Sequence, residues 1–183
     1  KYMYTNSLFG DILCEGAQGF WLDINHGNYP FVTSSYTLPY SACSLGFPPQ
    51  KIRKIYGAAK VYDTRVGVDP DFKDDLLNDN TLNKIAEVGK EFGTTTGRAR
   101  KVNWLNMNKL IDAINISGST DVIISKIDVL DTVGVFKYIW NDNIMNCNDI
   151  LELQNVITVS IYKYCKLAEN IIFSDNPESV DFF

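Results

Sequence analysis

Hydrophobic positions along the chain fall into short continuous runs and into patterns with helical spacing. The short runs predict strands at residues 11–15, 56–66, 122–124, 135–140 and 171–173. The helical spacing predicts helices at about residues 81–90 and 106–117 and a last helix around residues 157–168. Pro48 and Pro49 predict a further short helix through Arg53, because proline is tolerated in a first helical turn. Strands that alternate with helices in this way predict an α/β fold.

The run Val122-Ile123-Ile124 is continuous and β-branched, which is typical of a strand buried on both faces of a parallel sheet. We therefore expect a single domain, residues 1–183, with a mainly parallel central sheet and flanking helices. In such folds binding sites lie at the carboxyl ends of the strands. Polar residues that directly follow a predicted strand are thus the first candidates for function.

Composition and charge narrow the classes of partner. The 183 residues, 45% of them hydrophobic, supply enough apolar area for a packed core. A net charge of -5, with no run of Lys or Arg longer than two, lacks the positive footprint that nucleic-acid binding needs. The apolar runs are a few residues long, far below the roughly 20 of a membrane-spanning helix. We expect a soluble, cytoplasmic protein that binds neither nucleic acid nor membrane.

The four cysteines lie far apart without a C-x-x-C pair, and His26 is the single histidine. This spacing builds neither a zinc site nor a disulfide framework, so we expect reduced, buried thiols and no metal site made by this chain. A strand candidate begins almost at once, at Asp11, without a capped opening element. We therefore also expect the chain to be a piece of a longer protein.

The first candidate site is Lys126-Ile127-Asp128, which follows the predicted strand at residues 122–124. The Asp128 carboxylate can accept two parallel hydrogen bonds from N1–H and N2–H of guanine, whereas adenine presents an acceptor at N1. The stem of Lys126 can lie along the base with its charge in water. A solvated turn with a surface ion pair also explains so short a pattern, and is the commoner case.

The most unusual segment is a glycine-flanked loop that begins at Gly93. Its candidate anion-binding residues are Thr94, Thr95, Thr96, Gly97, Arg98, Ala99 and Arg100. Hydroxyls, backbone amides and guanidinium groups all donate hydrogen bonds to anions, so a dicarboxylate or a phosphate fits this loop. A basic turn without a ligand fits the same residues about equally well.

Two further polar residues lie in turns near the start of the chain. Gln18 can use both faces of its amide to read a purine edge, and Thr33 can bind a phosphate. Each is more often an ordinary turn residue. The chain contains no G-x-x-x-x-G-K-[ST] loop, so it cannot cradle a triphosphate in that way.

In this order the motifs resemble the adenylosuccinate synthetase family. The matching text is Glu15-Gly16-Ala17-Gln18-Gly19, Leu22-Asp23-Ile24, His26-Gly27, Tyr29-Pro30-Phe31-Val32-Thr33-Ser34-Ser35, Thr64-Arg65-Val66-Gly67, Glu91-Phe92-Gly93, Thr95-Thr96-Gly97-Arg98 with Arg100, Trp104-Leu105 and Lys126-Ile127-Asp128-Val129-Leu130. The match spans about residues 13–176. The resemblance implies a P-loop NTPase-like family fold, of which these residues lack the N-terminal phosphate loop.

The resemblance implies a Mg²⁺-dependent ligase of purine biosynthesis. In that family GTP phosphorylates the 6-oxygen of IMP, and the amino group of L-aspartate then displaces the phosphate to give adenylosuccinate. Mg²⁺ accompanies GTP, and its ligands are expected outside this chain. The resemblance also implies a homodimer, or a companion chain that carries the N-terminal half.

Roles can be carried over from the family residue by residue. The resemblance implies IMP binding by Gln18, Thr33 and Arg98. It implies an aspartate-binding loop made of Thr94, Thr95, Thr96, Gly97, Arg98, Ala99 and Arg100. It implies GTP binding by Arg100, Lys126, Ile127, Asp128, Ser174 and Asn176. The catalytic Asp and His of the family have no counterpart in these residues, so we expect no turnover by this chain alone.

Departures from the family leave two alternatives open. Asn176 stands where the family usually has glycine, and Val68-Asp69-Pro70-Asp71-Phe72 replaces the usual Pro-Phe-Pro-Thr-Glu. A phage branch of the family acts on dGMP, often with ATP or dATP as phosphate donor, and Asp128 favours a guanine donor instead. The other alternative is a non-catalytic remnant or subunit that binds a nucleotide.

Overall fold

The computed structural model describes residues 10–93 and 97–176. The chain divides into two compact units, of which the first ends at Arg53 and the second begins at Lys54. The expectation of one domain over the whole chain stays a prediction. Within the described ranges, no helix is long and apolar enough to cross a membrane.

Residues 10–53 of the first unit form loops and short 3-10 helices, with a buried carboxylate among them. The helices are η1 (Phe20–Leu22), η2 (Pro39–Leu45) and η3 (Pro49–Lys51). Asp23 is fully buried and accepts hydrogen bonds from the backbone N–H of Asn25 at 2.8 Å and of Thr37 at 2.7 Å. Burial acts to raise the pKa of Asp23, but these backbone donors hold it below its usual value. Asp23 therefore ties together two stretches of loop as a carboxylate.

Two expectations for this unit need correction. The predicted buried strand at residues 11–15 is wrong, because these residues are exposed and take no strand pairing. Leu13 is 84% exposed and Ile12 is 46% exposed, so the short apolar run around them does not pack into a core. The helix predicted from Pro48 is present only as the 3-10 turn η3.

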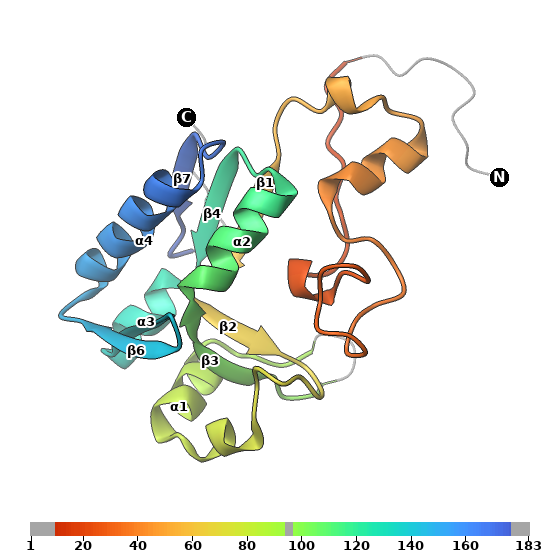
Figure 1. The fold of residues 1–183 in the computed structure, drawn as a ribbon. Coiled ribbons are helices and arrows are strands. Elements are labelled where there is room, and N and C mark those ends of the chain that lie inside the picture. Colours follow the sequence, from red (N-terminus) through yellow and green to blue (C-terminus); the bar gives the residue numbers. More distant parts are fainter. Residues whose placement is uncertain (1–9, 94–96, 177–183) are drawn as a thin grey trace. The chain divides into compact units, whose positions relative to one another are not determined.

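The second unit contains a three-stranded parallel sheet in the order β1-β4-β7 (Figure 1). These strands are β1 (Tyr56–Lys60), β4 (Asp121–Ser125) and β7 (Asn170–Phe173). The register pairs Lys60 with Ser125 and Ile124 with Phe173, so the three carboxyl ends share one edge. The continuous apolar run of β4 occupies the central position, as its sequence predicts. The predicted strands at residues 122–124 and 171–173 are confirmed.

A second sheet of four strands has the order β2-β3-β5-β6. Its strands are β2 (Tyr62–Arg65), β3 (Lys101–Asn106), β5 (Phe136–Trp140) and β6 (Asn143–Cys147). The β2–β3 and β5–β6 pairs are antiparallel, whereas β3 and β5 are parallel. The predicted strand at 135–140 is confirmed as β5, but β3 and β6 were not predicted.

The strand predicted at residues 56–66 is in fact two strands in two sheets. The break falls at Val61, whose backbone N–H donates to Ser125 O at 2.9 Å, while the next residue, Tyr62, pairs with Trp104 of β3. Val61 and Tyr62 are both buried. A continuous apolar pattern therefore spans the break, and hydrophobicity alone does not reveal it.

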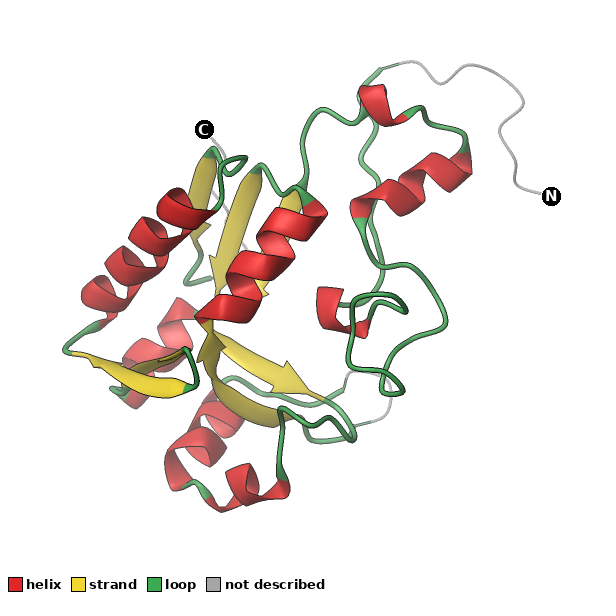
Figure 2. Cartoon of the chain, in the orientation of Figure 1, coloured by secondary structure: helices red, strands yellow, loops and turns green. Residues whose placement is uncertain are grey.

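Among the residues that the structure describes, four α-helices accompany the sheets, and α2 and α4 contact each other (Figure 2). They are α1 (Asn80–Val88), α2 (Met107–Ser117), α3 (Ile127–Val133) and α4 (Ile150–Tyr164). Side chains cap three of their N-termini: Asp79 accepts from Leu82 N at 3.1 Å, and Asn106 and Asp149 do the same for α2 and α4. Gly118 ends α2 with a φ of 70°, a left-handed cap that favours glycine. The helices predicted at 81–90 and 106–117 are confirmed, whereas α3 was not predicted. The last predicted helix is present, but it runs from Ile150 to Tyr164, so Cys165 and Ala168, expected on its face, lie beyond its end.

The core of the second unit lies between these helices and the two sheets. Its fully buried members include Ile85, Met107, Ile124, Leu130, Leu153, Ile157 and Ile161. They come from β4 and from all four α-helices, and Trp104 and Leu105 of β3 belong to the same cluster, so one hydrophobic cluster contacts both sheets.

The expectation of buried thiols holds for one cysteine and is wrong for another. Cys165 is buried, and burial raises the pKa of its thiol to about 11. Cys14 is exposed, because the segment around it forms no strand. All four cysteines are free thiols.

Asp63 on β2 makes the stability of the second unit depend on pH. Its carboxylate accepts a hydrogen bond from Asn106 N at 3.0 Å, but burial raises its pKa to about 6. In the folded state the carboxyl group of Asp63 therefore stays protonated up to a higher pH than in the unfolded chain. The stability that the group contributes is complete below about pH 4 and is lost as the pH rises through about 6.

Asp63→Asn removes the charge and keeps an oxygen that accepts from Asn106 N. We expect it to raise the free energy of unfolding by about 1–3 kcal/mol at about pH 7.5 and to leave it nearly unchanged at about pH 4. Urea denaturation at the two pH values measures the difference, with the exposed Asp75→Asn as control. An equal effect at both pH values would contradict the assignment.

Candidate functional site

Polar side chains gather at the carboxyl edge of the β1-β4-β7 sheet. Lys60 is the last residue of β1, and Lys126 and Ser174 directly follow β4 and β7. The strand ends are joined closely: Ser125 Oγ donates to Ala59 O at 3.0 Å, and Ser174 N donates to Ile124 O at 2.9 Å. Parallel pairing thus brings to one edge residues that are more than a hundred positions apart in sequence.

The structure brings together the residues that the resemblance assigns to the purine base. Ile127 N donates to Ser174 O at 3.4 Å, and Ser174 Oγ donates to Asn176 O at 2.8 Å. Lys126 has a φ of 70° and precedes α3, which places Asp128 in the first turn of that helix with its side chain exposed. The two predicted base-reading segments, one after β4 and one after β7, therefore touch. Their role in binding a base stays a prediction.

The loop after Gly93 is closed at its base by backbone hydrogen bonds. Phe92 and Ala99 form an antiparallel bridge, Gly93 N donates to Arg98 O at 2.8 Å, and Arg100 N donates to Glu91 O at 3.0 Å. Gly97, Arg98 and Ala99 are exposed. Thr94, Thr95 and Thr96 lie outside the described residues. The two described ends of the segment thus pair with each other, and Arg98, beside this pairing, is exposed.

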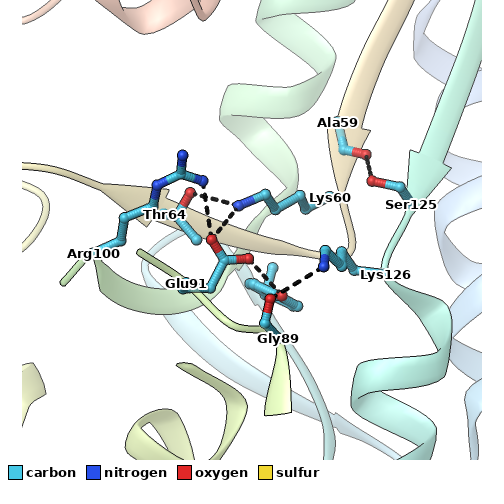
Figure 3. A network of polar contacts seen from close by, with 9 residues as sticks. Ala59, Lys60, Thr64, Gly89, Glu91, Arg100, Ser125 and Lys126 are labelled. Carbon is cyan, nitrogen blue, oxygen red and sulfur yellow. Dashed lines mark hydrogen bonds and ion pairs between the residues drawn. The ribbon is translucent and has the colours of Figure 1, made fainter. Parts of the chain in front are cut away.

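A buried carboxylate, Glu91, lies where this loop meets the sheet edge (Figure 3). Its exposed fraction is only 2%. Glu91 Oε1 accepts from Tyr62 Oη at 2.7 Å, while Oε2 accepts from Lys60 Nζ at 2.6 Å and from Arg100 at 3.1 Å. Lys60 also donates to Thr64 Oγ1 at 3.1 Å. One carboxylate therefore connects β1, β2 and the loop.

Burial and mutual hydrogen bonding shift the pKa values of Glu91, Lys60 and Tyr62. Burial acts to raise the pKa of Glu91, but the donors Lys60 and Tyr62 hold it below its usual value. Burial lowers the pKa of Lys60 from its usual value, against the pull of Glu91. Burial and the bond to Glu91 both raise the pKa of Tyr62. Glu91 is thus a carboxylate and Tyr62 a neutral donor at neutral pH.

The same segment of chain also contacts Lys126. Lys126 Nζ donates to Gly89 O at 3.1 Å, so the residues from Gly89 to Glu91 contact Lys60, Arg100 and Lys126 (Figure 3). Arg100 and Lys126 were predicted site residues, whereas Lys60, Tyr62 and Glu91 were not. Glu91 belongs to the Glu91-Phe92-Gly93 text that carries the family resemblance, and a carboxylate close to Arg98 and Arg100 is the sequence signal that could have found it.

The predicted IMP residues are divided between the two units. Gln18 lies in the first unit, is exposed and has a left-handed φ of 72°. Thr33, in the same unit, is half-buried: its N–H donates to Leu22 O at 2.8 Å and its hydroxyl lies 3.3 Å from Ser35 Oγ. Arg98 belongs to the second unit. The sharing of one IMP site by these three residues stays a prediction.

The residues of this edge do not fit a Mg²⁺ ion. Over residues 10–93 and 97–176 there is no group of three or more His, Cys, Asp or Glu side chains placed to hold a metal. Both oxygens of Glu91 already accept from Tyr62, Lys60 and Arg100, and a cation there would meet two positive charges. No step of the chemistry is therefore assigned to a metal held by these residues.

The fold and the site define an α/β protein whose cationic and hydroxyl side chains meet at the carboxyl edge of a parallel sheet. Comparison with known proteins gives the family. The family model described as adenylosuccinate synthetase matches residues 3–154. The chain belongs to the adenylosuccinate synthetase family.

Individual relatives agree with this assignment. The adenylosuccinate synthetase of Bacteroides fragilis is 49% identical over 127 residues, which cover 69% of this chain and 30% of the relative. That of Flavobacterium psychrophilum is 48% identical over 139 residues, covering 75% of this chain and 32% of the relative. The structure of fully ligated adenylosuccinate synthetase from Plasmodium falciparum matches with a TM-score of 0.70 at 25% identity, over 89% of this chain and 47% of that chain. The predicted α/β family fold is confirmed.

Each curated alignment covers about a third of the relative's length, 30% and 32% in these two cases. The family of the chain is therefore established by residues that form part of a longer enzyme in those organisms.

Gly89 is where a methyl group would disturb the Glu91 network. A Cβ there would collide with the hydroxyl of Tyr62 and lie 2.9 Å from Ile85 O, although the φ of -72° suits any residue. We expect Gly89→Ala to lower the free energy of unfolding by about 2 kcal/mol, as overpacking does.

Urea denaturation measures the effect of Gly89→Ala. Gly19→Ala is the matched control, because Gly19 has a φ of -82° and no atom within 4 Å of an added Cβ. Equal denaturation midpoints for the two variants would show that Tyr62 moves aside at no cost.

Proposed function

We propose that this chain supplies substrate-binding residues of a cytoplasmic purine-biosynthesis ligase that joins L-aspartate to IMP, with hydrolysis of GTP, to give adenylosuccinate. Membership of the adenylosuccinate synthetase family supports the reaction class. The observation that carries the proposal is the contact between Ile127 N and Ser174 O, which unites the two segments proposed to read guanine.

The proposed GTP site lies at the carboxyl edge of β4 and β7. Asp128 accepts from N1–H and N2–H of guanine, and the stem of Lys126 covers one face of the base. Ser174 and Asn176 complete the base pocket from the β7 side. Arg100 approaches the nucleotide from the loop, since it contacts Glu91 at the same edge as Lys60.

The proposed aspartate site is the loop from Thr94 to Arg100. Arg98 has an exposed guanidinium group, which can bind a carboxylate through two parallel hydrogen bonds. Arg98 also serves IMP in this proposal, together with Gln18 and Thr33 of the first unit. Binding two anions side by side requires donors of this kind, because positioning and charge stabilisation dominate phosphoryl-transfer chemistry.

The chain alone does not complete the ligase in this proposal. No catalytic residue is assigned to it, and Mg²⁺ enters with GTP on ligands outside these residues. The phosphate-binding half is supplied on the same polypeptide or by a companion chain, and the assembled enzyme is a homodimer. The isolated 183 residues are inactive, because binding loops lack the acid, the base and the phosphate cradle.

Product analysis of the native gene product tests the reaction. We expect adenylosuccinate from IMP, L-aspartate and GTP, and no product from the 183 residues alone. Separate reactions with dGMP and with ATP or dATP distinguish the phage-type activity. Turnover of dGMP alone would refute the choice of IMP, and no turnover of either substrate would favour a non-catalytic nucleotide-binding subunit.

Asp128→Asn tests the guanine site. The amide presents both a donor and an acceptor to N1–H and N2–H, so one of the two hydrogen bonds is lost. We expect the Kd for GTP in the native gene product to rise about tenfold or more, which is a loss of about 1.4 kcal/mol. Asp131→Asn, exposed on the same helix, is the control and should bind GTP as the wild type does. Equal affinities of the two variants would remove Asp128 from the site.

A further inference from the structure

The segment from Gly89 to Glu91 follows α1 and precedes the loop after Gly93, and it contacts the cationic side chains of Lys60, Arg100 and Lys126. We propose that Glu91 is a positioning residue that holds the guanidinium group of Arg100 in place for the nucleotide. This inference rests on the proposed function, because it takes Arg100 as a group that contacts GTP.

The surroundings of Glu91 leave it no direct part in chemistry. It is 2% exposed, and both its oxygens accept hydrogen bonds from protein side chains. A carboxylate in this state neither reaches a substrate nor takes up a proton readily. Its effect on a ligand therefore has to pass through the groups that it holds.

Arg100 is held by Glu91 at two points. Its backbone N–H donates to Glu91 O at 3.0 Å, and its guanidinium group donates to Glu91 Oε2 at 3.1 Å. The Arg100 side chain is 31% exposed, whereas that of Glu91 is 2% exposed. A guanidinium group carries five N–H donors, so one contact to Glu91 leaves donors to meet an anion from the exposed side.

Tyr62 fixes the position of Glu91 itself. Its hydroxyl donates to Glu91 Oε1 at 2.7 Å, and the residue is only 1% exposed within the core cluster. Its strand, β2, pairs with β3. The chain of contacts from the core through Tyr62 and Glu91 to Arg100 is therefore rigid at its inner end.

The charges around position 91 favour a carboxylate there. The positive charges of Arg100 and Lys126 both act on Lys60 and lower its pKa, after the larger effect of burial. Without Glu91, Lys60 and Arg100 would repel each other across a half-buried space. The carboxylate offsets this repulsion and keeps both side chains at the sheet edge.

A double-mutant cycle on the native gene product tests the inference, with the Kd for GTP measured by calorimetry. Glu91→Gln should weaken GTP binding about tenfold in the wild type but less than about twofold in an Arg100→Ala background, because Glu91 acts through Arg100. A merely structural role for Glu91 would weaken binding equally in both backgrounds, and that result would overturn the proposal. Glu87→Gln, exposed on α1, is the matched control.

A second measurement separates this inference from the proposed function. Relaxation of the Arg100 guanidinium ¹⁵N nuclei by NMR reports its mobility whether or not GTP binds. Glu91→Gln should increase that mobility while circular dichroism shows a folded protein, and unchanged mobility would overturn the proposal. Failure of the wild type to bind GTP would instead refute the proposed function.

Discussion

Parallel pairing of β1, β4 and β7 is the constraint on which the site in the second unit depends. Because the three strands run in one direction, the residues that follow them reach the same edge of the sheet. Lys60, Lys126 and Ser174 meet there from distant parts of the sequence. The buried apolar strand β4 lies at the centre of this sheet, so the same strand contributes to the hydrophobic core and positions Lys126 at the polar edge.

Glu91 adds a second constraint, which is electrostatic. Two cations, Lys60 and Arg100, share a space with one buried carboxylate. Burying a charge is costly unless it is paired and hydrogen-bonded, and here three donors satisfy Glu91. Tyr62 provides the neutral donor among them, which limits the positive charge at the edge. The network thus holds the donors Lys60, Arg100 and Tyr62 in place, and the charge of Glu91 offsets part of the positive charge of Lys60 and Arg100.

Several features of the fold were accessible from sequence patterns. The β-branched run of β4, the apolar stripe of α2 and its glycine stop at Gly118 were all read correctly, because each depends on neighbours within a few residues. The exposed segment near Leu13 was misread, since a short apolar run looks the same whether or not a partner strand exists. The break at Val61 was missed because residues on both sides of it are buried.

The sequence by itself determined the family, because an ordered set of motifs is a linear property of the chain, and the family resemblance picked out Lys126 and Ser174 at the sheet edge but not Lys60. It placed Lys126 and Asp128 after a strand and Arg98 and Arg100 in a loop for the same reason. Only the tertiary structure decided that Tyr62, some 29 positions from Glu91, is its partner. Contacts between residues so far apart in sequence depend on how the strands pair and how the chain folds back, and the spacing of neighbouring residues does not reveal either.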